Sequence, residues 1–188
     1  MHGNNRLWSA ALVVLLLLPA VIGAQDAVPV DKQANLLLKA LGYDRGLKKR
    51  APEGIRILVV HHGAAKTAGK IAVAFTTAGK SKVKGLAVTA SAAEFKDVKN
   101  LLQKADAGEF NILFVDPSAK GALSSLQQVT RGRKLLSLGG NHDLVKQGLS
   151  MGTYLKKGVP RLIINQRAAK VEGLDLAPAI RLIATTIK

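Results

Sequence analysis

Short runs rich in β-branched residues alternate with helical stretches through the middle of the chain, and this alternation constrains the fold more than any other feature. The run Ile55–His61 is almost continuously apolar, as a strand buried on both faces of a sheet must be. Three further strand-like runs occupy 86–89, 112–115 and 134–138. Helical stretches separate them at 64–78, 91–105 and 122–129. Strands that alternate with helices of this length predict βαβ units and a largely parallel sheet.

The C-terminal part of the chain predicts a hairpin followed by helices. Two β-favouring runs, 149–155 and 161–165, flank a short Gly-containing connection, which is typical of an antiparallel hairpin. Asn165 then begins a short helical stretch that stops at Gly173, and a final amphipathic helix is expected over 175–188. The buried side of that helix would carry Leu176, Ile180, Leu182 and Ile183. The expected fold class is therefore α/β: a three-layer sandwich with a mostly parallel mixed sheet, helices on both faces and a C-terminal antiparallel hairpin.

Two local patterns predict where helices begin. Asp31 is expected to cap an N-terminal helix that turns Leu37 and Leu41 inward. Ser91 and Glu94 form a capping-box pattern, which would open the helix at 91–105. Both predictions rest on side-chain oxygens that satisfy free N–H groups of a first helical turn.

The N-terminal 24 residues have the layout of a secretory signal peptide. Arg6 and the amino terminus are positive, residues 7–20 are apolar, and Gly23-Ala24 supplies small residues for cleavage. An uncleaved membrane anchor is the alternative, but the apolar run is short for a membrane span. We therefore expect residues 1–24 to be a signal peptide and residues 25–188 to form a single exported α/β domain.

The chain is strongly basic and contains no cysteine. Its 28 Lys and Arg residues against 12 Asp and Glu give a net charge of +16, or +15 once Arg6 leaves with the signal peptide. Such a field favours anionic ligands, partners or membrane surfaces, although basic proteins also use charge simply to stay in solution. Aromatic residues make up only 4% of the chain, too few for the stacking platforms of single-stranded nucleic-acid binding. We therefore expect no nucleic-acid partner, and a fold that depends on its hydrophobic core rather than on disulfides.

Four short stretches, spread over most of the mature chain, carry a resemblance to a known family. They are 36–41 followed by Tyr43-Asp44-Arg45, Gly148-Leu149-Ser150-Met151, Ile164-Asn165-Gln166-Arg167-Ala168-Ala169, and Gly173-Leu174. With the order of strands and helices around them, they resemble the YfiR-like family of periplasmic proteins. The resemblance agrees with a three-layer α/β fold. Some members of that family carry disulfides linked to redox control, a role that this cysteine-free chain cannot have.

The resemblance implies an exported, non-catalytic regulatory protein. Its partner would be an inner-membrane signalling protein, a sensor histidine kinase or a diguanylate cyclase, and the latter would connect the chain with cyclic di-GMP. The resemblance also marks Tyr43, Asp44, Arg45 and Asn165 as candidates for partner contact, although Asp44 and Arg45 are equally explained as a surface ion pair. The alternative function is a periplasmic small-molecule or anion-binding protein. A homodimer and an anionic membrane surface also stay open as binding partners.

Candidate ligand-binding residues also follow the first predicted strand. His61 and His62 end that strand, and ligands of open α/β sheets bind at the carboxyl ends of strands. Gly63-Ala64-Ala65 then opens a helix that carries Lys66, and backbone N–H groups at such a helix start can bind an anion. The alternative is a plain loop with a partly buried histidine, because adjacent side chains on a strand point to opposite faces.

The tetrapeptide Gly140-Asn141-His142-Asp143 also occurs in calcineurin-like metallophosphoesterases, where it serves a two-metal centre. Such a centre needs several further metal-binding stretches, and these are missing from the sequence. Asn141 more simply caps a short helix after a Gly-Gly turn. No serine lies on a G-x-S-x-G elbow, so we expect no enzymatic activity, no metal and no cofactor.

Overall fold

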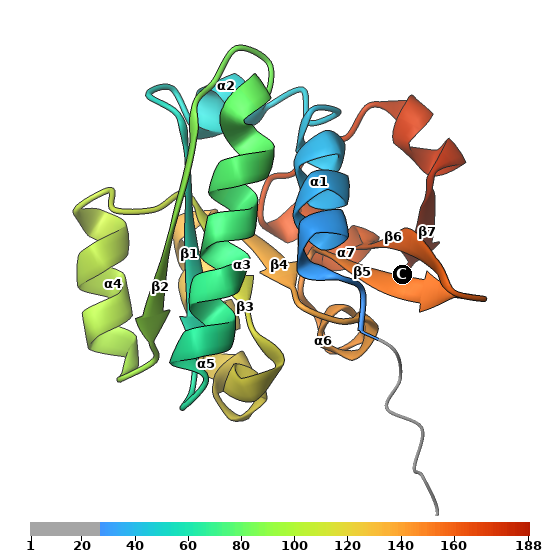
Figure 1. Cartoon of the computed structure of the whole chain (residues 1–188). Coiled ribbons are helices and arrows are strands. Elements are labelled where there is room, and N and C mark those ends of the chain that lie inside the picture. Colours follow the sequence, from blue (N-terminus) through green and yellow to red (C-terminus); the bar gives the residue numbers. More distant parts are fainter. Residues whose placement is uncertain (1–26) are drawn as a thin grey trace, which may run out of the picture.

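The structure, a computed structural model, describes residues 27–188 apart from the side chain of Arg181, and these residues form a seven-stranded sheet covered by helices (Figure 1). The predicted signal peptide lies outside the described residues. The strands are β1 Ile55–His61, β2 Val88–Glu94, β3 Ile112–Val115, β4 Leu136–Gly139, β5 Met151–Lys156, β6 Val159–Asn165 and β7 Ala184–Ile187, in the sheet order β2-β1-β3-β4-β5-β6-β7. Within residues 27–188, no helix combines the length and the apolarity that crossing a bilayer requires.

The pairing of the strands confirms the predicted mostly parallel sheet with one antiparallel hairpin. Each neighbouring pair from β2 to β5 is parallel, so that Phe114 of β3 lies level with Val59 of β1 and with Leu138 of β4. β5 and β6 form the hairpin, in which Met151 pairs with Ile164, and β7 pairs parallel with β6. Because β1, β3 and β4 lie inside the sheet, both of their faces are buried, which explains their apolar sequences.

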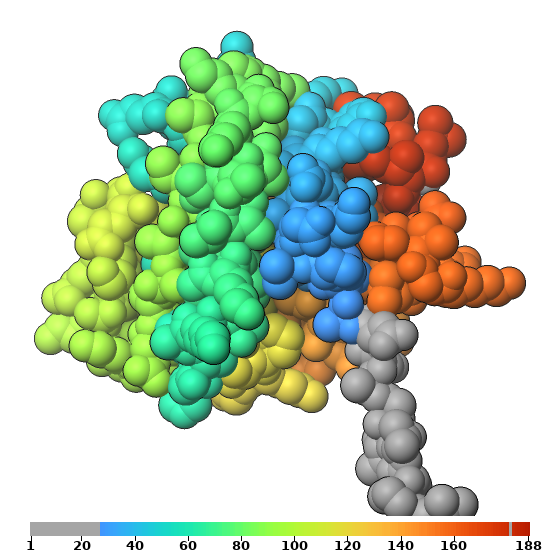
Figure 2. Space-filling view, in the orientation of Figure 1, coloured from blue at the N-terminus to red at the C-terminus, as the bar shows by residue number. Residues whose placement is uncertain are grey.

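Helices cover both faces of the sheet. They are α1 Val30–Leu41, α2 Leu47–Arg50, α3 Ala65–Ala78, α4 Val98–Asp106, α5 Leu123–Arg133, α6 His142–Lys146 and α7 Gln166–Val171, with the 3₁₀ turns η1 Gly79–Ser81, η2 Pro117–Ala122 and η3 Pro178–Leu182. α1 and α3 pack on one face around Leu37 and Phe75, whose ring meets Phe114 edge-on with centroids 5.4 Å apart. α4, α5 and α6 pack on the other face around Leu113 and Leu126. Figure 2 shows α1 and α3 side by side, with the β5–β6 hairpin projecting beyond them. The three-layer sandwich is therefore confirmed.

The helix starts predicted at Asp31 and at Ser91 are both wrong. α1 begins one residue before Asp31, which lies in the first turn, and no side chain caps the helix. Ser91 and Glu94 lie in β2, because the whole of β2 pairs with β1 and the hydrogen bonds of that ladder outweigh the local capping pattern. α4 starts later, where Asp97 Oδ1 accepts a hydrogen bond from the N–H of Asn100 at 2.7 Å.

The predicted C-terminal helix is also wrong. Its residues form the short turn η3 and the edge strand β7. The segment is rich in β-branched residues, and β6 offers an unpaired edge, so hydrogen bonds of a parallel ladder replace helical ones. Ile180 is buried in the core as expected, but Leu182, which we placed on the same side, is 87% exposed.

Candidate functional site

The two histidines at the end of β1 lie at the carboxyl ends of the parallel strands but in different surroundings. His61 is 5% exposed, and its Nδ1 is buried without a hydrogen-bond partner. His62 is exposed, and its backbone N–H donates to Ser118 Oγ at 3.1 Å. One imidazole is therefore enclosed by the protein while the other faces solvent.

Lys66 is exposed in the first turn of α3, and the loop before it is already engaged. The N–H of Gly63 donates to Glu94 Oε1 at 3.2 Å. One of the backbone N–H groups that we expected to bind an anion is therefore already hydrogen-bonded to a carboxylate of the protein. Lys66 lines neither of the two pockets described below.

The segment Tyr43-Asp44-Arg45 ties the N-terminal helix to the C-terminal part of the chain. Asp44 is fully buried: its Oδ1 accepts a hydrogen bond from the N–H of Asp175, and its Oδ2 lies 3.6 Å from Arg50 Nε, too far for a hydrogen bond. The exposed side chain of Arg45 makes two hydrogen bonds to the Asp175 carboxylate. These bonds, and then the charge of Asp175, raise the pKa of the Arg45 guanidinium above its ordinary value. Tyr43 is half-buried beside them.

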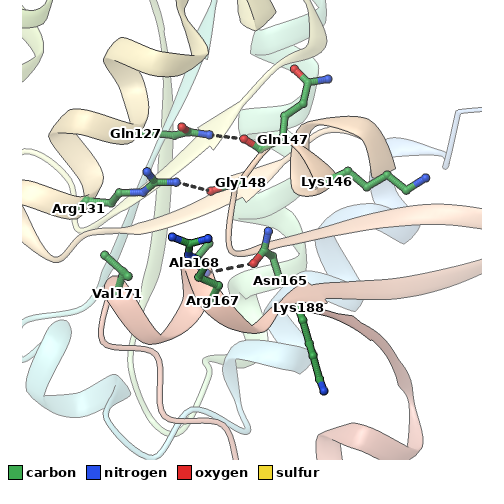
Figure 3. Close-up of a pocket in the computed structure, with 10 residues that line it drawn as sticks. All are labelled: Gln127, Arg131, Lys146, Gln147, Gly148, Asn165, Arg167, Ala168, Val171 and Lys188. Atoms are coloured by element: carbon green, nitrogen blue, oxygen red, sulfur yellow. Dashed lines mark hydrogen bonds between the residues drawn. The ribbon is translucent and has the colours of Figure 1, made fainter.

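A pocket of about 580 Å³ opens between the end of α5, the loop after α6 and the start of α7 (Figure 3). It is lined by Gln127, Arg131, Lys146, Gln147, Gly148, Asn165, Arg167, Ala168, Val171 and Lys188. We call it the basic pocket, because four of these ten residues have cationic side chains and none has a carboxylate side chain. The cations come from four separate elements of the chain: Arg131, Lys146, Arg167 and Lys188. In Figure 3 the arginines lie between α5 and α7, whereas the two lysine side chains extend outward.

Hydrogen bonds between its walls hold the loop that closes the basic pocket. Gln127 Nε2 donates to the carbonyl oxygen of Gln147 at 2.7 Å, and the Arg131 guanidinium donates to the carbonyl oxygen of Gly148 at 3.3 Å. Gly148 has a φ of +109°, which residues with a side chain rarely adopt. A glycine at this position lets the chain turn from α6 towards β5 while keeping both contacts to α5.

Asn165, which the family resemblance marked for contact, lines the basic pocket, but both ends of its amide are used inside the protein. Its Oδ1 accepts from the N–H of Ala168 at 3.1 Å and so caps α7, the helical stretch that the sequence predicted to begin here. Its Nδ2 donates to the carbonyl oxygen of Val145 at 3.1 Å. Asn165 therefore positions α7, and with it Arg167, rather than offering a free amide to a ligand.

Glu172 is a fully buried carboxyl group that connects the walls of the basic pocket, and no sequence pattern singled it out. It accepts hydrogen bonds from the N–H and the hydroxyl of Ser137, from the hydroxyl of Thr130 at 2.7 Å, and from the hydroxyl of Ser150. Thr130 precedes Arg131 on α5, Ser150 follows the closing loop, and Glu172 itself ends α7. A single buried glutamate produces no periodic pattern in the sequence, so only the folded chain reveals its hydrogen bonds.

A second pocket, of about 490 Å³, lies at the carboxyl ends of the parallel strands. It is lined by Ala27, Val28, Pro117, Gly140, Asn141, His142, Thr153, Tyr154, Leu155 and Gly158. We call it the neutral pocket, because none of these residues carries a permanent charge. The rings of His142 and Tyr154 lie 5.1 Å apart, and Asn141 caps α6 through the N–H of Leu144, as predicted. Within residues 27–188, no three His, Asp or Glu side chains gather closely enough to hold a metal ion.

Comparison with known families decides the affiliation of the chain. The family described as DUF4154, YfiR/HmsC-like, matches residues 33–185. The chain belongs to the YfiR/HmsC-like family. This family is periplasmic and regulatory rather than enzymatic, and its members regulate inner-membrane signalling proteins, so membership supports a periplasmic regulatory role at the family level. Among curated proteins, none matches the chain.

Solved structures share the fold of this YfiR/HmsC-like chain at low sequence identity. A conserved domain protein from Vibrio cholerae is 15% identical with a TM-score of 0.58, over 85% of this chain and 60% of that one. A substrate-binding protein with adhesive properties from Clostridium difficile, in a ligand-free open structure, is 12% identical with a TM-score of 0.55, over 80% and 59%. The ABC domain from Streptococcus pneumoniae in complex with L-Trp is 10% identical with a TM-score of 0.60, over 85% and 62%. The match thus spans about three fifths of each of those proteins, and the likeness concerns the fold alone.

Proposed function

We propose that this protein is exported by its N-terminal signal and acts in the periplasm as a non-catalytic regulator. Its target is the periplasmic part of an inner-membrane signalling protein, a diguanylate cyclase or a sensor histidine kinase, whose activity it lowers. The observation that carries the proposal is membership of the YfiR/HmsC-like family over residues 33–185. Binding to the inactive conformation of the target shifts its conformational equilibrium and needs no chemical step.

Arg45 is the best placed of the residues that the resemblance marked for partner contact. Its side chain is 61% exposed, whereas Asp44 is fully buried and Tyr43 is half-buried. A contact at this segment is therefore made by Arg45 and the outer part of Tyr43, while Asp44 holds the segment in place. The basic character of the whole chain favours a target surface rich in carboxylates.

Deletion of the gene in its source organism tests the regulatory proposal. We expect a rise in cellular cyclic di-GMP, or in phosphorylation of the target kinase, that a plasmid copy reverses. Arg45→Ala is expected to weaken capture of the target from solubilised membranes, whereas Lys99→Ala, which removes an exposed cation from α4, is a matched control. A deletion strain with unchanged cyclic di-GMP and unchanged kinase phosphorylation would contradict the proposal.

The proposed export has its own test. Mass spectrometry of the periplasmic fraction is expected to find a chain that begins within a few residues of Gln25, because Gly23-Ala24 is the predicted cleavage site. Recovery of the intact N-terminus from that fraction would show that the segment is not a cleaved signal peptide.

A second candidate function is a periplasmic small-molecule or anion-binding protein. The basic pocket favours it, because a cavity of about 580 Å³ lies within the size range of small-molecule sites. The two functions are compatible, since a ligand that favours one conformation of a regulator changes its affinity for the target.

A further inference from the structure

We propose that the basic pocket binds a small molecule through a phosphate or pyrophosphate group, an inference that rests on the second candidate function. Four cationic side chains surround one cavity without a carboxylate side chain among its lining residues. Gathering like charges costs free energy in the empty pocket, and a multiply charged anion removes that cost. A phosphate monoester carries close to two negative charges at neutral pH and therefore suits this site.

The comparison of Arg131 with Arg133 shows that the cations of the pocket are free to act. Arg133, two residues along α5, makes two hydrogen bonds to the carboxylate of Asp106, at 2.6 and 3.0 Å. Arg131 meets only the carbonyl oxygen of Gly148, at 3.3 Å. Within the described part of the chain, no carboxylate side chain forms an ion pair with any of the four cations of the basic pocket.

The geometry favours phosphate over a single carboxylate. Arg131 approaches from α5 and Arg167 from α7, so two guanidinium forks share one space (Figure 3). One fork already satisfies the two oxygens of a carboxylate, whereas the three oxygens of a phosphate group can accept hydrogen bonds from both forks. The lysines at the rim then act as point charges towards the remaining oxygens.

Glu172 makes this pocket a preorganised site. Its carboxyl group links Thr130, Ser137 and Ser150 by hydrogen bonds, so α5, the closing loop and α7 keep their relative positions without a ligand. Rigid walls lower the ordering cost of binding. Glu172 is thus a positioning residue and does not itself face the anion.

Isothermal titration calorimetry of the purified mature protein with inorganic pyrophosphate tests the proposal. We expect saturable binding at a 1:1 ratio that weakens about a hundredfold in the double variant Arg131→Gln/Arg167→Gln, because each lost charge-assisted contact weakens binding roughly tenfold. The control Lys99→Gln/Arg161→Gln removes the same charge from exposed positions outside the pocket and is expected to bind like the unmodified protein. Equal weakening in both double variants, or tighter binding of succinate than of pyrophosphate, would overturn the assignment.

A second arm distinguishes a free phosphorylated molecule from a lipid headgroup. Vesicles of phosphatidylglycerol in phosphatidylcholine replace pyrophosphate, and the same variants are compared by sedimentation. Vesicle binding lost only in Arg131→Gln/Arg167→Gln identifies a headgroup, and pyrophosphate binding without pocket-dependent vesicle binding identifies a free ligand. Absence of pocket-dependent binding in both arms would refute the phosphate site while leaving the regulatory proposal, which is tested in cells, untouched.

Discussion

The two pockets are similar in size and differ in electrostatic character. The neutral pocket lies at the carboxyl ends of the parallel strands, where α/β sheets usually bind ligands, and none of its lining residues carries a permanent charge. The basic pocket lies between α5, the loop after α6 and α7, and it gathers four cationic side chains with no carboxylate side chain among its lining residues. In this fold, the concentration of positive charge therefore lies away from the place where α/β sheets usually bind ligands.

The largest effect is expected from removing the carboxyl group of Glu172, which links α5, β4 and the segment before β5. Glu172→Ala leaves the N–H of Ser137 and three buried hydroxyl groups without their acceptor, and each such loss costs about 1–3 kcal/mol. We expect the free energy of unfolding, measured by urea denaturation, to fall by about 4 kcal/mol or more. Glu53→Ala, which removes the exposed partner of Arg56, is the control and should change it by less than about 0.5 kcal/mol. Equal free energies of unfolding for the two variants would show that Glu172 does not hold Thr130, Ser137 and Ser150 together.

Two glycines allow each pocket to be disturbed separately. A Cβ at position 140 would lie 2.7 Å from Pro117 Cδ, so Gly140→Ala is expected to cost about 1–3 kcal/mol of stability by overpacking the wall of the neutral pocket. A Cβ at position 148 would lie 2.9 Å from Gln127 Nε2 and 3.0 Å from the Arg131 guanidinium, at a strained φ. Gly148→Ala therefore also destabilises by about 1–3 kcal/mol, but it alone displaces side chains of the basic pocket.

Calorimetry with pyrophosphate separates these two glycine variants. Only Gly148→Ala is expected to weaken binding, while Gly140→Ala binds like the unmodified protein at a temperature where both are folded. Weakened binding in Gly140→Ala would mean that the two pockets are coupled and do not act as independent sites.

Arg131 and Arg133 allow a cation of the basic pocket to be compared with a nearby cation that already has a carboxylate partner. Arg131→Gln is expected to weaken pyrophosphate binding about tenfold, because it removes a charged donor from the pocket. Arg133→Gln removes the same charge two residues away, where the guanidinium is engaged with Asp106, and is expected to leave binding within about twofold. Similar losses in both variants would indicate attraction by the general field of the protein rather than by a defined site.

The smallest expected effect concerns pH. Hydrogen bonds from Arg133, and then its charge, hold the pKa of the exposed Asp106 carboxyl below its ordinary value, although partial desolvation opposes them. Because the folded pKa is the lower one, the pair contributes to stability above the unfolded pKa, and this contribution is lost as the pH falls through the folded pKa. In Arg133→Gln, NMR titration of the side-chain carboxyl should show the pKa of Asp106 returning towards its ordinary range, whereas Arg131→Gln should leave it unchanged.

The sequence predicted the parts of the fold that are governed by local patterns. The apolar runs of β1 and β3 were predicted correctly because both faces of these strands are buried. The cap at Asn141 and the helix start at Asn165 were predicted correctly because each depends on residues that are close in the sequence. The pattern at Ser91 and the C-terminal helix misled because pairing with β1 and β6 decides the structure there. Ladder hydrogen bonds from distant segments do not appear in a local pattern.

The site was harder to predict than the fold. The sequence pointed to His61, His62 and Lys66, since they follow a strand, but the structure places them apart from the basic pocket. The cations of that pocket come from four separate segments, and only the folded chain shows which basic residues converge. Asn165 was singled out and does line the pocket, although as a helix cap.

The first helix depends on the last part of the chain, and this has a consequence for the order of folding. Gln33 donates to Thr153 Oγ1, 120 residues later, and Asp44 accepts from the N–H of Asp175, 131 residues later. α1 also shares its apolar cluster with Ile164 and Ile180. A chain released from its N-terminus, by a ribosome or a translocation channel, therefore delivers α1 long before its partners exist. Closing such long loops is slow, so this topology leaves α1 without its packing partners until nearly all of the chain has emerged.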